Sequence, residues 1–164
     1  MRGPREPLDV DRLSREGAEV DFAIELSELA GLRTLRAGVA GSVRGHVRFG
    51  REQEFNVAEL SFSGTAVLEC QRCMGPMERT LEVLTRVALV PTEEEAAGVP
   101  PEFEPVLAGG GRISIEQLLS EELLLTLPIV PLHEGAGSCT ATRPQAREGE
   151  THKPFARLAE LVKR

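Results

Sequence analysis

The fold is decided by residues 55–90, which read FNVAELSFSGTAVLECQRCMGPMERTLEVLTRVALV. Apolar and polar side chains alternate up to Cys70, and after a short turn they alternate again from Met77 to Val90. This period of two is typical of half-buried β-strands, because successive side chains point to opposite faces of a sheet. The stretch therefore predicts two long strands, joined by a turn that contains Cys70 and Cys73.

Two earlier segments, residues 18–26 and 39–49, show the same alternation. The last three runs follow one another through short connections, which is typical of an antiparallel meander. We therefore expect an α+β fold, in which helices pack against a curled antiparallel β-sheet of about five or six strands. Closure into a barrel-like form is one outcome that strong curling would allow.

A helix is predicted over residues 114–126. Ser114 followed by Gln117 is an N-terminal capping pattern. Apolar residues recur after it at helical spacing: Ile115, Leu118, Leu119, Leu123 and Leu127. Pro128 disfavours helical geometry in the residue before it and so ends the helix. We expect the leucine stripe to lie in the core.

The remaining segments carry weaker patterns. Residues 1–17 are expected to form a loosely ordered N-terminal arm that could include one short helix. Residues 91–112 are acidic and rich in proline and glycine, which predicts a long exposed loop. A short amphipathic helix is predicted over residues 154–161, with proline at its start. We find no internal boundary and expect residues 1–164 to form a single domain.

The net charge of −7 conceals a basic segment between residues 31 and 51. It holds five arginines and no acidic residue: Arg33, Arg36, Arg44, Arg48 and Arg51. Arginine binds phosphate bidentately, so these residues and Arg72 are candidate RNA contacts. The chain has no Trp or Tyr, so such contact would be to the RNA backbone rather than through base stacking. A solvated arginine face with no ligand is the alternative.

The chain has three cysteines, and two of them, Cys70 and Cys73, have the spacing of one half of a structural zinc site. The second half would be Cys139 with His133 or His152, which gives a Cys3His ligand set. Reduced cysteines that pack as small apolar residues are the alternative. Redox chemistry is disfavoured, because the pair ends a predicted strand rather than beginning a helix. A structural zinc ion is the one cofactor that we consider.

Other patterns narrow the class of protein. No apolar run approaches about 18 residues, and the N-terminus lacks the apolar core of a signal peptide. We therefore expect a cytoplasmic protein with reduced thiols and no membrane association. No catalytic triad, pair of carboxylates or phosphate loop can be assembled, so we expect the chain not to be an enzyme.

Three segments resemble the YceD family of large ribosomal RNA subunit accumulation proteins. They are LECQRC at 68–73, EFEP at 102–105, and residues 113–133, which end in LTLPIVPLH. Lys153-Pro154-Phe155, with Leu158 and Leu161, is similar to the family's C-terminal tail. The resemblance covers residues 55–164. Many relatives carry several further cysteines after the LP segment, whereas this chain has only Cys139 downstream of His133.

The resemblance implies a non-enzymatic factor that promotes the synthesis, processing or accumulation of large-subunit (23S) ribosomal RNA. Its partner would be ribosomal RNA, a pre-ribosomal particle, or a ribosomal or RNA-processing protein. The alternative is a zinc-stabilised interaction adaptor that does not contact RNA, with the acidic loop and helix as its surface.

Overall fold

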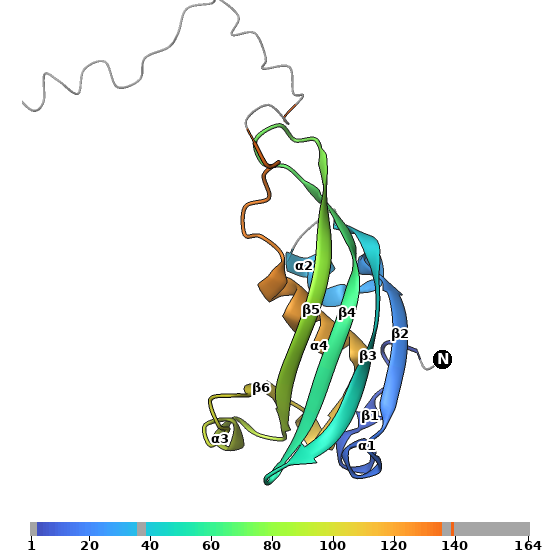
Figure 1. Cartoon of the computed structure of the whole chain (residues 1–164), viewed down its shortest axis with the longest axis vertical. Helices are drawn as coiled ribbons and strands as arrows, with labels where there is room; N and C mark the ends of the chain where they lie inside the picture. Colours follow the sequence, from blue (N-terminus) through green and yellow to red (C-terminus); the bar gives the residue numbers. More distant parts are fainter. Residues whose placement is uncertain (1–2, 36–38, 136–138, 140–164) are drawn as a thin grey trace, which may run out of the picture.

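The main sheet has five strands in the spatial order β2-β3-β4-β5-β6 (Figure 1). The computed structural model describes residues 3–35, 39–135 and 139, and for residues 33–35 it describes the backbone alone. The strands are β2 (Glu19–Glu25), β3 (Ala40–Glu52), β4 (Phe55–Glu69), β5 (Pro76–Val90) and β6 (Glu104–Leu107). The first four form an antiparallel meander, whereas β6 runs parallel to β5. The predicted α+β class is confirmed.

Tight connections hold the long strands in register. Glu52 pairs with Phe55 across the turn between β3 and β4, where Gln53 adopts a left-handed φ of 53°. Strands β3 and β4 also approach closely, because a Cβ added at Gly45 would overlap the carbonyl oxygen of Ser61. Glycine is therefore required at position 45.

The sheet is open, so the barrel-like alternative is wrong. Its edge strands β2 and β6 are not neighbours, and β6 pairs with only the last four residues of β5. One face of the sheet is covered by α4 (Ile115–Thr126), as Figure 1 shows. The sheet curls around this helix rather than around itself, so its edges do not meet.

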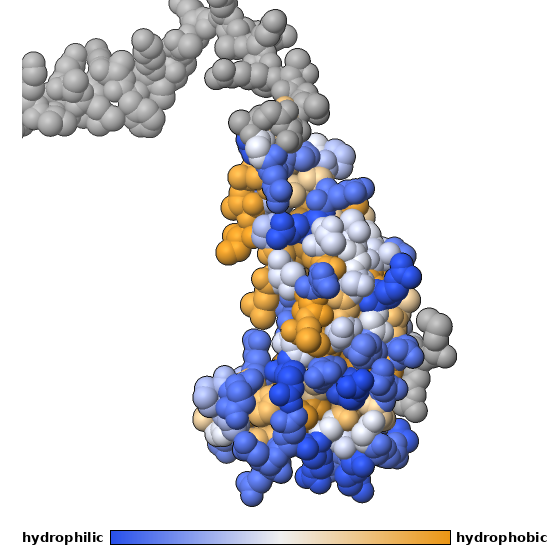
Figure 2. Space-filling view, viewed as in Figure 1, coloured by the Kyte–Doolittle hydropathy of each residue, from blue (hydrophilic) through white to orange (hydrophobic). Residues whose placement is uncertain are grey.

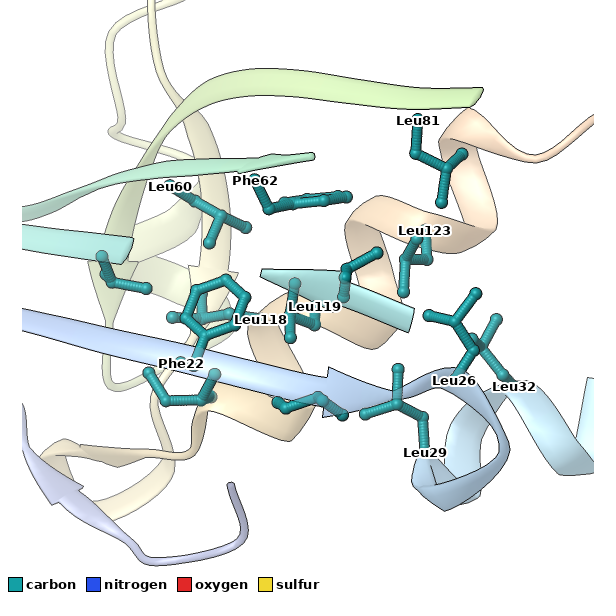
Figure 3. Packing of buried hydrophobic residues seen from close by; sticks show 14 of the residues in the cluster. Phe22, Leu26, Leu29, Leu32, Leu60, Phe62, Leu81, Leu118, Leu119 and Leu123 are labelled. Atoms are coloured by element: carbon teal, nitrogen blue, oxygen red, sulfur yellow. The ribbon is translucent and has the colours of Figure 1, made fainter. Parts of the chain in front are cut away.

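The core lies between α4 and the sheet (Figure 3). Leu118, Leu119 and Leu123 are fully buried on the helix and pack in one cluster with sheet residues. Sheet members of this cluster include Phe22, Leu60, Phe62 and Leu81. The Ser114 side chain accepts a hydrogen bond from the Gln117 backbone N–H at 3.1 Å, so the predicted helix start is confirmed. The prediction that the leucine stripe lies in the core is also confirmed.

Residues 3–17 are more ordered than the sequence pattern indicates. Strand β1 (Leu8–Asp9) pairs with β7 (Arg112–Ile113), and α1 (Val10–Glu16) follows directly. The Asp9 side chain caps α1 by accepting from the Arg12 N–H. Leu8, Val10 and Leu13 are buried, so this segment joins the core. After β2 the chain forms η1 (Leu26–Glu28) and α2 (Ala30–Leu35).

Residues 91–112 do not form one continuous loop. They contain α3 (Glu93–Ala96), strand β6, the short helix η2 (Gly109–Gly111) and the start of β7. Phe103 is buried against Val57 and Ala88, and this contact holds the segment against the end of the sheet.

The helix predicted over residues 154–161 lies outside the described residues. Within the described part of the chain, no helix has the length and apolar character needed to span a membrane.

Candidate metal centre

The turn between β4 and β5 positions the first two cysteines. The Cys70 N–H donates to the Gly75 carbonyl oxygen at 2.9 Å, and the Met74 N–H donates to the Cys70 carbonyl oxygen at 2.7 Å. Met74 adopts a left-handed φ of 58°, which tightens the turn. Cys70 is fully buried, and Cys73 is half-buried. The local backbone thus fixes both thiols at one end of the sheet.

The segment after α4 returns to the same turn. Pro128 ends the helix as predicted, and the chain then runs in a non-helical path towards the cysteines (Figure 1). The Gln71 N–H donates to the Pro131 carbonyl oxygen at 2.9 Å, and Arg72 Nη2 donates to the His133 carbonyl oxygen at 3.0 Å. These two hydrogen bonds hold His133 beside the turn.

Three cysteines and one histidine meet there: Cys70, Cys73, His133 and Cys139. Their ligand atoms all lie within 4.8 Å of one another. Sγ of Cys73 is 3.4 Å from Nδ1 of His133, Sγ of Cys139 is 3.7 Å from the same atom, and the Sγ atoms of Cys70 and Cys139 are 3.9 Å apart. Ligands of tetrahedral zinc, bound at about 2.0–2.3 Å, lie about 3.4–3.8 Å from each other. The donor set and its spacing therefore fit zinc.

His133 already has the tautomer that a metal ligand needs. Its Nε2 lies 3.0 Å from the Pro76 carbonyl oxygen, which can only accept a hydrogen bond. Nε2 therefore carries the proton, and the lone pair of Nδ1 faces the thiols. Metal-binding histidines commonly donate their second N–H to a carbonyl in this way. The alternative ligand His152 lies outside the described residues.

The thiols differ in acidity. Burial would raise the pKa of the Cys70 thiol, but the backbone N–H groups of His133, Arg72 and Cys73 donate to its sulfur and lower that pKa to about 5. Burial, followed by hydrogen bonds involving Cys73 and Cys70, raises the pKa of Cys139 to about 11. Cys70 is therefore a thiolate at neutral pH, whereas Cys139 must release a proton to bind metal.

The arrangement suits a structural site. Four protein ligands would complete the shell of a tetrahedral metal ion, which would leave no position for a catalytic water. Cys70 follows a strand and is fully buried, whereas redox-active thiols lie partly exposed at helix N-termini. A metal here would tie the turn between β4 and β5 to residues 133–139.

Three of the candidate RNA contacts, Arg44, Arg48 and Arg51, are exposed on β3. Arg48 Nε lies 3.4 Å from Glu19 Oε2 and its Nη1 lies 3.6 Å from Glu59 Oε1, so two exposed ion pairs partly offset its charge. Arg44 and Arg51 are exposed and form no ion pair in the described part of the chain. Arg72 lies in the turn between β4 and β5, which we call the cysteine turn. The side chains of Arg33 and Arg36 lie outside what the structure describes.

Comparison with known proteins places the chain in a family. The model of the family described as "Large ribosomal RNA subunit accumulation protein YceD" matches residues 58–162, which is more than half of the chain. The chain belongs to the YceD family. All four members of the cysteine-histidine cluster lie within the matched range. The match confirms the resemblance that the sequence motifs indicate.

A curated member of the YceD family gives a second comparison. The "Large ribosomal RNA subunit accumulation protein YceD" of Haemophilus influenzae is 32% identical over 101 residues. The match covers 57% of this chain and 58% of that relative, so the chain spans little more than half of the relative's length. No solved structure matches the chain significantly.

Proposed function

We propose that this chain is a non-enzymatic factor that promotes the accumulation of large-subunit ribosomal RNA by binding RNA or a pre-ribosomal partner. The match to the YceD family over residues 58–162 carries this proposal, because the family's name describes that role. The four-ligand cluster supports a binding role, since a closed ligand shell offers no open coordination position for chemistry. We expect the chain to act in the cytoplasm, where ribosomal RNA is made.

A complementation experiment tests the function. A strain that lacks the gene for this chain should have a lower ratio of 23S to 16S ribosomal RNA than its parent strain. Expression of the natural chain should restore the parental ratio. An unchanged ratio in the deletion strain would refute the proposal.

We also propose that Cys70, Cys73, His133 and Cys139 hold one Zn²⁺. Purification without chelators should give about one zinc per chain. Cys73→Ser should lower this content strongly, whereas His46→Ala, outside the cluster, should not. His46 belongs to a second, exposed group with Glu19 and Asp21, so this control also tests metal binding there. Zinc well below one per chain in the natural protein would contradict the proposal.

The RNA contact is proposed to centre on Arg44. This side chain lines a hollow of about 570 Å³ on the sheet surface, together with His46, Ser61, Ser63 and one carboxylate, that of Glu82. Hydroxyl, imidazole and guanidinium groups all donate hydrogen bonds to phosphate oxygens. We propose five other arginines as additional contacts to the RNA backbone that contribute less to binding: Arg33, Arg36, Arg48, Arg51 and Arg72.

Binding to 23S ribosomal RNA fragments should weaken steeply as salt rises, because contacts to phosphate release counterions. Arg44→Glu should weaken binding about tenfold or more, whereas Arg112→Glu, an exposed arginine on β7, should have little effect. If the natural chain binds no RNA at low salt but co-purifies with one protein, the adaptor alternative is correct.

A further inference from the structure

A run of exposed apolar side chains lies beside the candidate metal centre. Leu125, Ile129, Val130 and Leu132 are 68%, 87%, 51% and 42% exposed, although they fall within eight residues of each other. We call these four residues the apolar patch. Figure 2 shows apolar atoms gathered along the segment that follows α4, beside β5. Exposed apolar side chains that are grouped in this way are typical of a contact site, whereas single ones occur on any solvated face.

The patch continues into a hollow with an acidic surround. A space of about 590 Å³ lies between the start of β5 and the segment after α4, where Pro76 and Met77 face Val130 and Leu132. Glu78, Arg79 and Glu134 line the same hollow, and Arg79 Nη1 lies 3.7 Å from Glu134 Oε1, so that this pair is close to neutral. The net charge of the lining therefore comes from Glu78, and Glu121 is exposed nearby on α4, one turn before Leu125. An occupant should therefore combine an apolar face with positive charge.

We propose that residues 154–162 of this chain occupy the apolar patch. Phe155, Leu158 and Leu161 recur at a spacing that places them on one face of a helix beginning at Pro154. Within residues 154–162 the charges of Arg157 and Glu160 balance, and the positive charge lies at the two ends of the segment, on Lys153, Lys163 and Arg164. The apolar stripe and the charge both match the patch and its surround. This proposal stands independently of the role in ribosomal RNA accumulation.

The tether makes the contact easy to reach. Sγ of Cys139 lies 3.7 Å from Nδ1 of His133, which directly follows Leu132 of the patch. The 14 residues from 140 to 153 span up to about 50 Å when extended and about 20 Å on average as a flexible chain. The eight residues of the patch segment span at most about 28 Å. A tether of this length gives an effective concentration in the millimolar range, so a modest apolar contact is sufficient.

The absence of Trp and Tyr from the sequence provides a clean reporter. In the full-length variant Phe155→Trp, the single indole should emit at short wavelength and resist quenching by acrylamide. Both properties should be independent of protein concentration. Solvent-exposed emission from the monomer would refute the proposal. Buried emission that requires high concentration and a dimer in sedimentation would assign the patch to a second copy instead.

Patch variants locate the contact. Adding Leu125→Asp and Val130→Asp to Phe155→Trp should expose the indole and lower the ratio of docked to free tail at least tenfold. The matched control Leu84→Asp alters an exposed leucine on β5 outside the patch and should leave the emission unchanged. An indole that stays buried in the patch variant would place the tail elsewhere and overturn the proposal.

Hydrogen exchange on the chain with its natural Phe155 gives a second measurement, in case the introduced indole itself disturbs the contact. Amides of residues 155–162 should be protected, and Leu125→Asp with Val130→Asp should remove that protection. Unprotected amides in the natural chain would overturn the proposal. The zinc content of each variant should equal that of the natural chain, which separates failure of the tail contact from failure of the metal centre.

Discussion

The two ends of the β4–β5 hairpin are held together by different forces. Along most of its length the sheet packs against α4, where leucines such as Leu119 are removed completely from solvent. At the turn between β4 and β5 there is no helix beneath the strands in the described part of the chain. Leu68, Cys70 and Met77 still belong to the core cluster there, and hydrogen bonds and a cluster of metal-ligating side chains add to this burial. The difference shows that specific polar contacts can supplement apolar burial where a long hairpin reaches the edge of its core.

The largest expected effect is at the core end. Leu119→Ala should lower the free energy of unfolding by about 2–5 kcal/mol, because it leaves a cavity among fully buried side chains. Denaturant unfolding should show the loss as a lower midpoint. Leu84→Ala, at an exposed leucine on β5 outside the apolar patch, is the control and should change the midpoint much less. Equal effects would mean that α4 does not carry the core.

Loss of metal should lower the stability of the cysteine turn. Chelation of the metal-loaded chain, or His133→Ala, should remove about 3 kcal/mol of stabilisation when free zinc is about a hundredfold above its dissociation constant. Hydrogen exchange should speed up at residues 70–75 and 129–134, while α4 keeps its protection. Uniform loss of protection across the sheet would contradict the division between the two ends.

The pH dependence of zinc affinity sharpens this picture. Cys70 has a pKa lowered to about 5 and is already a thiolate at neutral pH, whereas Cys139 has a pKa raised to about 11 and must lose its proton. Affinity should therefore rise between pH 6 and pH 8, and the Cys139 thiol alone should contribute about tenfold per pH unit. Competition with a chromophoric chelator measures this slope. Cys139→Ser should reduce the slope, and an unchanged slope would contradict the assignment.

The smallest effect concerns Glu122 on α4. Burial and the nearby charge of Glu104 raise the pKa of this carboxyl. The folded state therefore binds the proton more tightly than the unfolded state, so protonation of Glu122 stabilises the fold. This stabilisation is lost as pH rises through the folded-state pKa. Glu122→Gln should raise the unfolding midpoint slightly at pH 7 and leave it unchanged near pH 4. Glu54→Gln, at an exposed carboxyl in the turn between β3 and β4, is the control and should change the midpoint much less at either pH.

Elements with strong local periodicity could be predicted from sequence. The alternation that defines β3, β4 and β5 and the stripe that defines α4 are each visible within a single segment. The ligand set could also be proposed, because the spacing of Cys70 and Cys73 limits the partners to the few remaining cysteines and histidines. What the sequence did not provide was a choice between His133 and His152 or the hydrogen bond from His133 to Pro76.

Features that depend on long-range pairing could not be predicted. Strands β1, β6 and β7 contain two to four residues, which is too short for a pattern to be visible. The ion pairs that Arg48 forms with Glu19 and Glu59 depend on the register of three strands. The pairing of β3 with β4 follows from the position of the turn at Gln53, so it could be predicted only if the sequence identified the exact residues of that turn.

The separation of the ligands along the chain has a consequence for the order of synthesis. Cys73 and His133 are 60 residues apart, and everything between them, including α4, is made before the histidine leaves the ribosome. A metal bound by all four ligands would therefore close the cluster only after β5, β6 and α4 have emerged. Metal binding would act like a late cross-link that closes a large loop. Closing this loop costs conformational entropy, and in a zinc-free chain only packing could offset that cost. The metal would thus mark a chain whose core is already complete.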